Sequence, residues 1–260
     1  MKIASFNVNS IKAHLDQVTA WLKDAQPDVL CMQETKCPDD GFPSLLLQAE
    51  GYPHSALFGQ KSYNGVAIIS KFPLEDVRRG LPEFPDEQSR FIEAVVSTPK
   101  GIVRVASIYL PNGNPVGSDK YPYKLRWIDS LATHARTLLA LEEPLVLAGD
   151  YNVIPTAEDV YDPAPWTNDA LFTRDTRLAF RRLVNLGFTD AIRACHAEPH
   201  LYTFWDYQAG AWQKNKGLRI DHLLLSPQAA DRLVGAGIDK QARGWDRPSD
   251  HVPVWCQLAN

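Results

Sequence analysis

Cysteine is scarce in this sequence, and long apolar runs are absent from it. The 260 residues include four cysteines, which are scattered and form neither a C-x-x-C pair nor a metal-finger spacing. These features exclude a disulfide framework and a cysteine-based zinc site, and we expect the thiols to be reduced. No apolar run approaches the ~18 residues that a membrane-spanning helix requires, so no membrane partner is expected.

A secretory signal and an excess of positive charge are also missing. The segment MKIASFNVNS has one lysine but neither an apolar core nor a small-residue cleavage site, which predicts a cytoplasmic protein. The formal net charge is −4. Any surface that binds nucleic acid must therefore be local, because the overall charge repels phosphate.

The sequence does contain many short segments rich in Val, Ile and Leu. Strands are expected at Lys2–Asn9, Val29–Glu34, Val66–Ser70, Phe91–Thr98, Ile102–Leu110, Leu145–Asn152, Asp221–Ser226 and Val252–Leu258. Helices are expected at Lys12–Ala25, Lys124–Leu141 and Thr176–Leu186. The strands come in clusters and no linker divides the chain. This pattern predicts one α/β domain over residues 1–260, with two packed sheets covered by helices.

Polar residues follow directly on the apolar run in the segment LVLAGDYN. Residues two apart on a strand face the same side, so Asp150 and Asn152 are expected to project together from the strand end. Two such oxygen-bearing side chains suit a hard cation, a water molecule or a phosphate. A helix N-cap is the alternative interpretation of the same residues.

Other predicted strands also end in polar side chains. These are Asn7 and Asn9, Gln33 and Glu34, and Tyr109 with Asn112. Asparagine is disfavoured in strands, so its repetition at strand ends indicates function. Asp221 lies inside an apolar strand, where a buried carboxylate needs a partner. We expect that partner in the turn of SDHVPVW, which carries Asp250 and His251. A purely structural turn histidine is the alternative for His251.

Nine short segments occur in order along the whole chain. They are KIASFNVNSI, LCMQETK, NGVAIISK, IYLPNG, LAGDYNVIP, NLGFTDAIR, YTFWDY, GLRIDHLLLS and SDHVPVW. Together they resemble the exonuclease III family of AP endonucleases, within the endonuclease/exonuclease/phosphatase group. The resemblance implies a DNase I-like four-layer α/β sandwich, in which two mixed β-sheets pack face to face with helices outside. It also implies metal-dependent hydrolysis of DNA 5′ to abasic sites, with 3′-phosphodiesterase and 3′→5′ exonuclease activity.

The resemblance further implies a magnesium site. Glu34 would be the principal ligand of Mg²⁺, with Mn²⁺ as a possible substitute, helped by Asn7 and Asp250. Asp150 and Asn152 could themselves host a metal, so the choice between one ion and two stays open. Oxygen ligands without a Cys/His cluster suit Mg²⁺ or Mn²⁺ rather than zinc.

Catalytic roles are carried over in the same way. Asp150 would activate the attacking water, and Asn152 would position the water and the phosphate. Tyr109 would contact the phosphate or the leaving group, and His251, held by Asp221, would neutralise the phosphate oxygens. A phosphodiester repels nucleophiles, so its hydrolysis requires charge neutralisation and a positioned water.

The expected partner is double-stranded DNA with abasic sites or 3′ ends, bound by a monomer. Basic segments supply Arg78, Arg79, Lys120, Lys124, Arg126, Arg174, Arg177, Lys214, Lys216 and Arg219, for which solvated surface is the alternative. We expect DNA contacts from Asn112, Lys120, Arg174, Arg177 and Lys216. Phe204, Leu218 and Ile220 are expected to form the pocket for a flipped abasic sugar, with core packing as the alternative. Competing functions are a same-fold phosphoesterase for another substrate and a non-catalytic DNA-binding scaffold.

Overall fold

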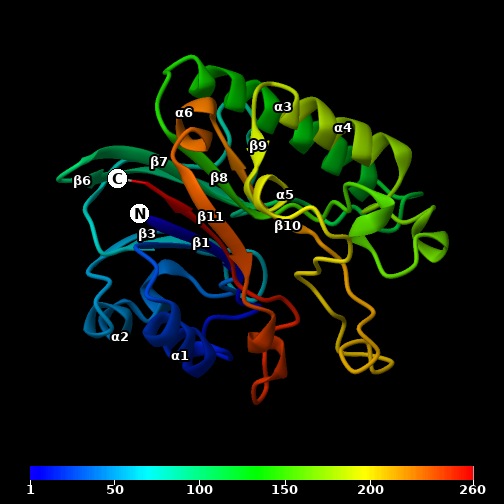
Figure 1. Ribbon diagram of the computed structural model, residues 1–260, viewed down its shortest axis with the longest axis horizontal. Coiled ribbons are helices and arrows are strands. Elements are labelled where there is room, and N and C mark those ends of the chain that lie inside the picture. Colours follow the sequence, from blue (N-terminus) through cyan, green and yellow to red (C-terminus); the bar gives the residue numbers. More distant parts are fainter. Residues whose placement is uncertain (260) are drawn as a thin grey trace.

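Two six-stranded mixed β-sheets pack face to face in the computed structural model, which describes residues 1–259 (Figure 1). The first sheet has the order β11 (Leu233–Ile238), β12 (Val254–Leu258), β1 (Lys2–Asn7), β2 (Val29–Gln33), β4 (Val66–Ser70) and β3 (His54–Phe58). The second has the order β5 (Leu74–Arg79), β6 (Phe91–Thr98), β7 (Gly101–Tyr109), β8 (Leu145–Asp150), β10 (Asp221–Leu225) and β9 (Thr189–Asp190).

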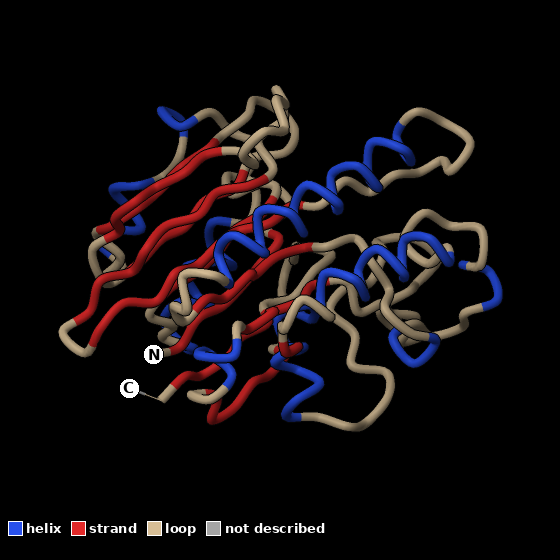
Figure 2. Tube along the Cα trace, turned by 90° about the horizontal axis from the view of Figure 1, so that it is seen from above, coloured by secondary structure: helices blue, strands red, loops and turns tan. Residues whose placement is uncertain are grey.

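Helices cover the outer face of each sheet, which makes four layers. α1 (Leu15–Ala25) and α2 (Ser44–Ala49) lie on the first sheet. α3 (Lys120–Leu139) and α4 (Arg174–Val184) lie side by side across the second sheet, as the view from above shows (Figure 2). The short helices α5 (Ala191–Cys195) and α6 (Pro227–Ala230) flank β10. The predicted four-layer sandwich is therefore confirmed.

The central strands are buried on both faces, which explains their continuous apolar runs. In β8, Val146 and Ala148 pack between the sheets, whereas Leu145 and Leu147 pack under the helices. No described helix is long and apolar enough to cross a membrane.

Two parallel strand pairs bring polar residues to one end of the sandwich. β1 pairs with β2 so that Asn7 lies opposite Gln33, and β7 pairs with β8 so that Tyr109 lies opposite Asp150. Parallel strands end at the same edge of a sheet. The antiparallel strand β10 begins at this edge, with Asp221 opposite Asp150. The polar residues that stand at the ends of apolar strands in the sequence thus form one polar cluster in the fold.

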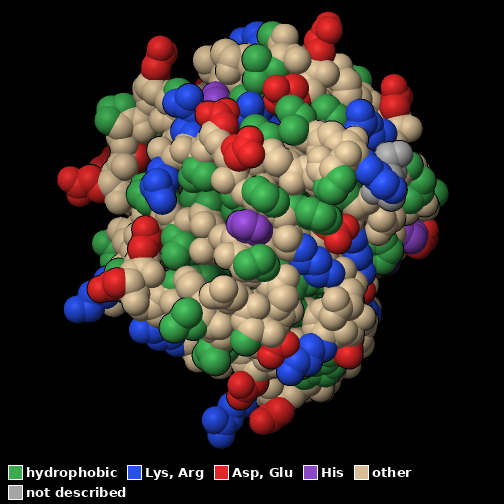
Figure 3. All heavy atoms as spheres, turned by 90° about the vertical axis from the view of Figure 1, so that its left-hand side faces the viewer, with side chains coloured by type: hydrophobic (Ala, Val, Ile, Leu, Met, Phe, Trp, Pro, Cys, Tyr) green, Lys and Arg blue, Asp and Glu red, His purple; other side chains and the backbone are tan. Residues whose placement is uncertain are grey.

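The opposite end of the sandwich carries a cavity instead of the polar cluster. This cavity of about 420 Å³ is lined among others by Met1, Gly101 and Leu258. Hydrophobic side chains are spread over this face, with acidic and basic side chains scattered among them (Figure 3). None of the residues that line this cavity belongs to the polar cluster.

Several predicted boundaries are wrong. β12 begins at Val254 rather than Val252, and α1 begins at Leu15 rather than Lys12. α3 spans Lys120–Leu139 rather than Lys124–Leu141, and α4 spans Arg174–Val184 rather than Thr176–Leu186. The first strand ends at Asn7 rather than Asn9, and β8 ends at Asp150 rather than Asn152. Asn9 and Asn152 have φ values of 44° and 47°, in the left-handed region that cannot continue a strand. Asp150 and Asn152 therefore do not share a strand face. The strands β3, β5, β9 and β11 and the helices α2, α5 and α6 were not predicted, because they are short or lie at exposed edges.

Candidate active site

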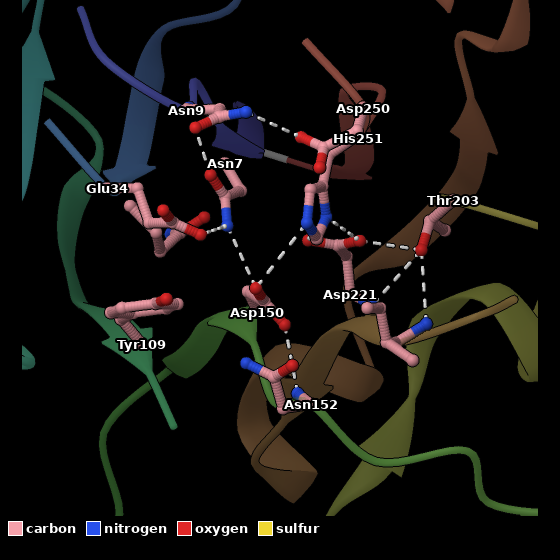
Figure 4. Close-up of polar contacts among 12 residues, drawn as sticks. Asn7, Asn9, Glu34, Tyr109, Asp150, Asn152, Thr203, Asp221, Asp250 and His251 are labelled. Carbon is pink, nitrogen blue, oxygen red and sulfur yellow. Dashed lines mark hydrogen bonds and ion pairs between the residues drawn. The ribbon is translucent and has the colours of Figure 1, made fainter. Parts of the chain in front are cut away.

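Asn7 joins two carboxylates that come from different sheets (Figure 4). Its Nδ2 donates hydrogen bonds of 2.9 Å to Oε1 of Glu34, which follows β2, and of 2.9 Å to Oδ2 of Asp150, the last residue of β8. Lys36 approaches the other side of Glu34, with Nζ 2.8 Å from Oε2. Asn7 and Asp150 are buried, and Glu34 is partly exposed. The two carboxylates thus converge at an opening to solvent.

His251 lies between two aspartates. Its Nδ1 is 2.9 Å from Oδ2 of Asp221, and its Nε2 is 3.7 Å from Oδ2 of Asp150. Thr203 donates a hydrogen bond of 2.6 Å from Oγ1 to Oδ2 of Asp221. Asp221, His251 and Thr203 are all buried, so the imidazole is held in a fixed orientation.

Burial and charge shift the pKa values of Asp150 and His251 upward. Burial raises the pKa of the Asp150 carboxyl to about 7, although the charge on His251 opposes this shift. Burial alone would lower the pKa of His251, but Asp221 and Asp150 raise it to about 10. At neutral pH the imidazole is therefore a cation, and Asp150 is the group that can accept a proton near neutrality.

Glu34 and Tyr109 stay in opposite protonation states. Burial opposes ionisation of Glu34, but Lys36 and the hydrogen bond from Asn7 lower the pKa of its carboxyl below the ordinary value. Burial, followed by the charges of Glu34 and Asp150, raises the pKa of Tyr109 well above its ordinary value. Glu34 is thus an anion, and the phenol of Tyr109 remains a proton donor.

Two tight turns of the same kind hold the polar strand ends. The backbone N–H of Asn152 donates to Oδ1 of Asp150 at 2.9 Å, and that of Asn9 donates to Oδ1 of Asn7 at 3.0 Å. Asx side chains commonly bond the backbone two residues on, and asparagine tolerates the left-handed conformation that follows. Asn112 donates to Oδ1 of Asn152 at 3.2 Å, which links this turn to the loop after β7.

The donor set fits a divalent cation. Glu34, Asp150 and His251 each offer one atom within 4.8 Å of the others. Since the imidazole is protonated, the carboxylate oxygens of Glu34 and Asp150 are the available ligands, and hard cations prefer oxygen. Asp250 is turned away from this group, and its Oδ1 accepts a hydrogen bond of 3.1 Å from Asn9. Its role as a metal ligand remains a prediction.

Of the residues expected to contact DNA, Asn112 and Phe204 contact residues of this cluster. Asn112, Lys120, Arg174 and Lys216 are exposed, and Arg177 is partly exposed. The ring of Phe204 lies edge-on to His251, with centroids 4.9 Å apart. Leu218 and Ile220 are buried in an apolar cluster on which Phe204 packs.

Two basic residues expected on the DNA-facing surface are buried, so that expectation is wrong. Lys124 has no exposed area, and Arg219 is 1% exposed. Arg219 lies 2.7 Å from Oδ1 of Asp159 through Nε and 2.7 Å from Oδ2 of Asp190 through Nη1. A sequence of neighbouring charges does not reveal which of them has a buried partner.

Several residues of the site were not predicted. They are Thr203, Lys36 and Ser249, which accepts the His251 N–H and donates to the Asn7 carbonyl. Lys36 stands two residues after Glu34, and this spacing is a signal that could have found it. Ser249 begins the segment SDHVPVW and bonds the N–H two residues on, so its place beside His251 is also a local signal. Thr203 contacts Asp221, which is distant in sequence, so no local signal exists for it.

Together, fold and site define a class of protein: a DNase I-like α/β hydrolase with its site at one end of the sandwich. The chain matches the Endonuclease/Exonuclease/phosphatase family over residues 4–251, and it belongs to this family. It is 32% identical to exodeoxyribonuclease III of Haemophilus influenzae, over 99% of this chain and 100% of that protein. It is 33% identical to DNA repair nuclease APEX1 of Danio rerio, over 100% of this chain and 82% of that protein.

Solved structures give the same result. The 3′ phosphatase NExo from Neisseria, bound to a product DNA hairpin, superposes with a TM-score of 0.95 at 41% identity, over 100% of both chains. An AP endonuclease from Archaeoglobus fulgidus superposes with a TM-score of 0.94 at 38% identity, over 99% of both chains. The resemblance to the exonuclease III family that the nine motifs predicted is confirmed.

Proposed function

We propose that this protein is a DNA repair nuclease that hydrolyses phosphodiester bonds 5′ to abasic sites in duplex DNA and acts on 3′ ends as a 3′-phosphodiesterase and 3′→5′ exonuclease. The observation that carries the proposal is the meeting of Glu34, Asp150 and protonated His251 within 4.8 Å. The similarity to exodeoxyribonuclease III and to an AP endonuclease supports DNA as the substrate.

The catalytic roles follow from the charges of the site. His251, held by Asp221, places a positive charge where the phosphate oxygens would bind. Asp150 takes the proton of the attacking water, because it is the group whose pKa lies near neutrality. Asn152 orients that water, and the neutral phenol of Tyr109 donates a hydrogen bond to the phosphate or the leaving group.

Mg²⁺ is the proposed cofactor, with Mn²⁺ as a substitute. Glu34 is its principal ligand, and Asn7, Asp150, Asn152 and Asp250 are further candidates. When bound, such an ion polarises a phosphoryl oxygen and lowers the pKa of a coordinated water. The ionised state of Glu34 and the oxygen-rich donor set support this assignment.

The DNA contacts are assigned to the exposed rim of the site. Asn112, Lys120, Arg174, Arg177 and Lys216 contact phosphates, which positions a duplex without reading its sequence. Phe204, with Leu218 and Ile220 behind it, forms the apolar wall that accepts a flipped abasic sugar. Flipping costs least where the base is missing, so selectivity for damage needs no base contact.

The chain is also proposed to act as a single-domain monomer over residues 1–260. The pairing of β1, near the start of the chain, with β12, near its end, and the apolar core shared by the two sheets support a single domain. Sedimentation equilibrium would test the oligomeric state.

A duplex oligonucleotide with one tetrahydrofuran site, incubated with Mg²⁺, tests the proposed function. We expect a nick 5′ to this site, and Glu34→Gln should slow it about a thousandfold, because a loss of ~4 kcal/mol of charge stabilisation is three factors of ten. Glu75→Gln is the matched control, since Glu75 is exposed on β5, away from the site. Unchanged cleavage by Glu34→Gln would contradict the role of Glu34.

Matched duplexes with a 3′-phosphate or a recessed 3′ end measure the other activities. A wild-type enzyme that cleaves none of these DNA substrates, but releases phosphate from a small ester, would overturn the choice of DNA as substrate.

A further inference from the structure

Lys124 is a fully buried lysine behind the turn that carries Asp150 and Asn152. It lies in the first turns of α3, and its Nζ donates two hydrogen bonds to backbone carbonyls. One goes to Asn112, in the loop after β7, at 2.9 Å, and the other goes to Asn152, in the turn after β8, at 2.6 Å. A single ammonium group therefore joins the loops that follow two neighbouring parallel strands.

The chain leaves room for this side chain at Gly113. A Cβ at position 113 would lie 2.6 Å from Cδ of Lys124, and the φ of Gly113 is +89°. Only glycine adopts this conformation readily and lets the lysine stem pass so close to the loop. The loop and the lysine are thus fitted to each other.

Packing alone does not explain a lysine at this position. Its Nζ is enclosed by protein, and burying an amino group in this way costs free energy unless it is hydrogen-bonded. A methionine has a similar shape and would fill the same space without that cost. What lysine adds is hydrogen-bond donors for two carbonyls.

The contacts of Asn152 connect Lys124 to the proposed catalytic base. The carbonyl of Asn152 accepts from Lys124, and its N–H donates to Oδ1 of Asp150 at 2.9 Å. Its side chain accepts from Asn112 and donates to the Leu110 carbonyl at 3.0 Å. Asn152 is held in a left-handed conformation with φ of 47°, which persists only where its surroundings determine it.

We propose that Lys124 is a positioning residue for hydrolysis: by holding the carbonyls of Asn112 and Asn152 together, it fixes the turn that orients Asp150 and the attacking water. It touches neither substrate nor metal and acts through Asn152. The inference rests on the proposed function, since it assigns a catalytic consequence to the geometry of this turn.

Lys124→Met tests the inference through the rate of cleavage on bound DNA. We expect the single-turnover rate at saturating duplex to fall about 100-fold, which is typical of a misplacement of about 1 Å at a catalytic group. The affinity for DNA, measured by fluorescence anisotropy with EDTA, should change little, because the side chain is buried. Lys124→Gln retains N–H donors and should be faster than Lys124→Met.

Two control variants separate positioning from a loss of stability. Leu131→Ala removes a buried side chain of the same helix, and this apolar side chain donates no hydrogen bond to either loop. It should lower the melting temperature without slowing bound-state cleavage. Lys23→Met makes the same chemical change at an exposed lysine of α1 and should be neutral. Wild-type rates in Lys124→Met, or an equal slowing in Leu131→Ala, would overturn the proposal.

Amide hydrogen exchange provides a readout that does not depend on activity. In Lys124→Met the N–H of Asn152 should exchange faster, while the amides of Leu145–Gly149 in β8 should be unaffected. Unchanged exchange at Asn152 would also overturn the proposal. If the wild type cleaves no DNA, the proposed function fails, and the exchange experiment still decides whether Lys124 holds the turn.

Discussion

The Asp150 carboxyl and the His251 imidazole both bind protons more tightly than the free amino acids do. For Asp150 the cause is burial, and for His251 it is the pair of aspartates on either side. The result is a proton acceptor near neutrality beside a group that is a cation at neutral pH, which is the pairing that water activation at a phosphodiester requires.

The pH dependence of cleavage should follow from these shifts. Only ionised Asp150 accepts a proton, so kcat/KM should rise with pH through the pKa of Asp150, which is about 7 without metal. A bound cation lowers this pKa, so the acidic limb should lie at higher pH when Mg²⁺ is limiting. Above about pH 10, His251 loses its charge and activity should fall.

Rate profiles at limiting and saturating Mg²⁺ measure both limbs. An acidic limb that moves to higher pH as Mg²⁺ is added would contradict the assignment of Asp150 as the base.

At the scale of elements, the site depends on how closely β7 and β8 approach. Gly149 belongs to β8 and lies opposite Ile108 of β7, and a Cβ there would be 2.1 Å from the carbonyl oxygen of Ile108. Backbone atoms cannot rotate away as a flexible side chain can. Glycine at this position therefore keeps Asp150 in register with Tyr109.

Gly149→Ala should destabilise the protein by about 1–3 kcal/mol, the usual range for overpacking, and should also slow cleavage because Asp150 is the next residue. Urea denaturation and the nicking assay measure the two effects. Gly235→Ala, in the edge strand β11, is the control, because nothing lies within 4 Å of a Cβ there. Equal stability of the two variants would show that β7 and β8 can separate without cost.

A second connection between elements is the buried ion network of Arg219. This residue precedes β10, and it joins Asp159 in a short 3₁₀ helix to Asp190, which caps α5. The charge of Arg219 overcomes the effect of burial and lowers the pKa of both carboxyls. The network holds the segment Leu218–Asp221, which includes Leu218 and Ile220 of the apolar wall and Asp221, the partner of His251.

Arg219→Met should cost about 3–5 kcal/mol of stability, because it leaves the largely buried Asp190 without its arginine and leaves the buried Asp159 with Arg193 alone. Arg182→Met is the matched control: its pair with Asp129 is 3.3 Å long but exposed, so the change should stay within about 0.5 kcal/mol. Urea denaturation of both variants at neutral pH gives the comparison. A loss of stability no larger than that of the control would mean that water or rearranged side chains compensate the carboxylates in place of Arg219.

At the scale of the whole molecule, the two sheets meet at the proposed metal site. Glu34 follows a strand of one sheet and Asp150 ends a strand of the other, with Asn7 between them. Two carboxylates so close repel each other, and a cation between them removes this repulsion. Metal binding should therefore stabilise the packing of sheet on sheet.

Mg²⁺ at a hundred times its dissociation constant should raise the free energy of unfolding by about 2.7 kcal/mol, the value that mass action gives for one site. Denaturation with and without Mg²⁺ measures this. Glu34→Gln should abolish the increase, whereas Glu75→Gln should retain it. An equal increase in both variants would place the stabilising ion elsewhere.

The sequence by itself determined the strands of the central sheets and the identity of the polar residues at their ends. Strands such as Val66–Ser70 and Phe91–Thr98 were predicted with their observed boundaries, because apolar runs between turn residues have few other ways to be buried. Asn7, Glu34, Asp150 and His251 were identified because polar residues in such places conflict with local preference.

Only the tertiary structure decided which charges are buried and where the strands end. Lys124 and Arg219 stand among basic neighbours and look like surface residues, yet carbonyls and carboxylates distant in sequence hold them inside. Asn9 and Asn152 fit a strand pattern, but hydrogen bonds to the preceding Asx side chains turn them out of it. A local sequence pattern shows which side chains the hydrophobic effect favours burying. Burial of a charged side chain depends instead on partners that only folding brings together.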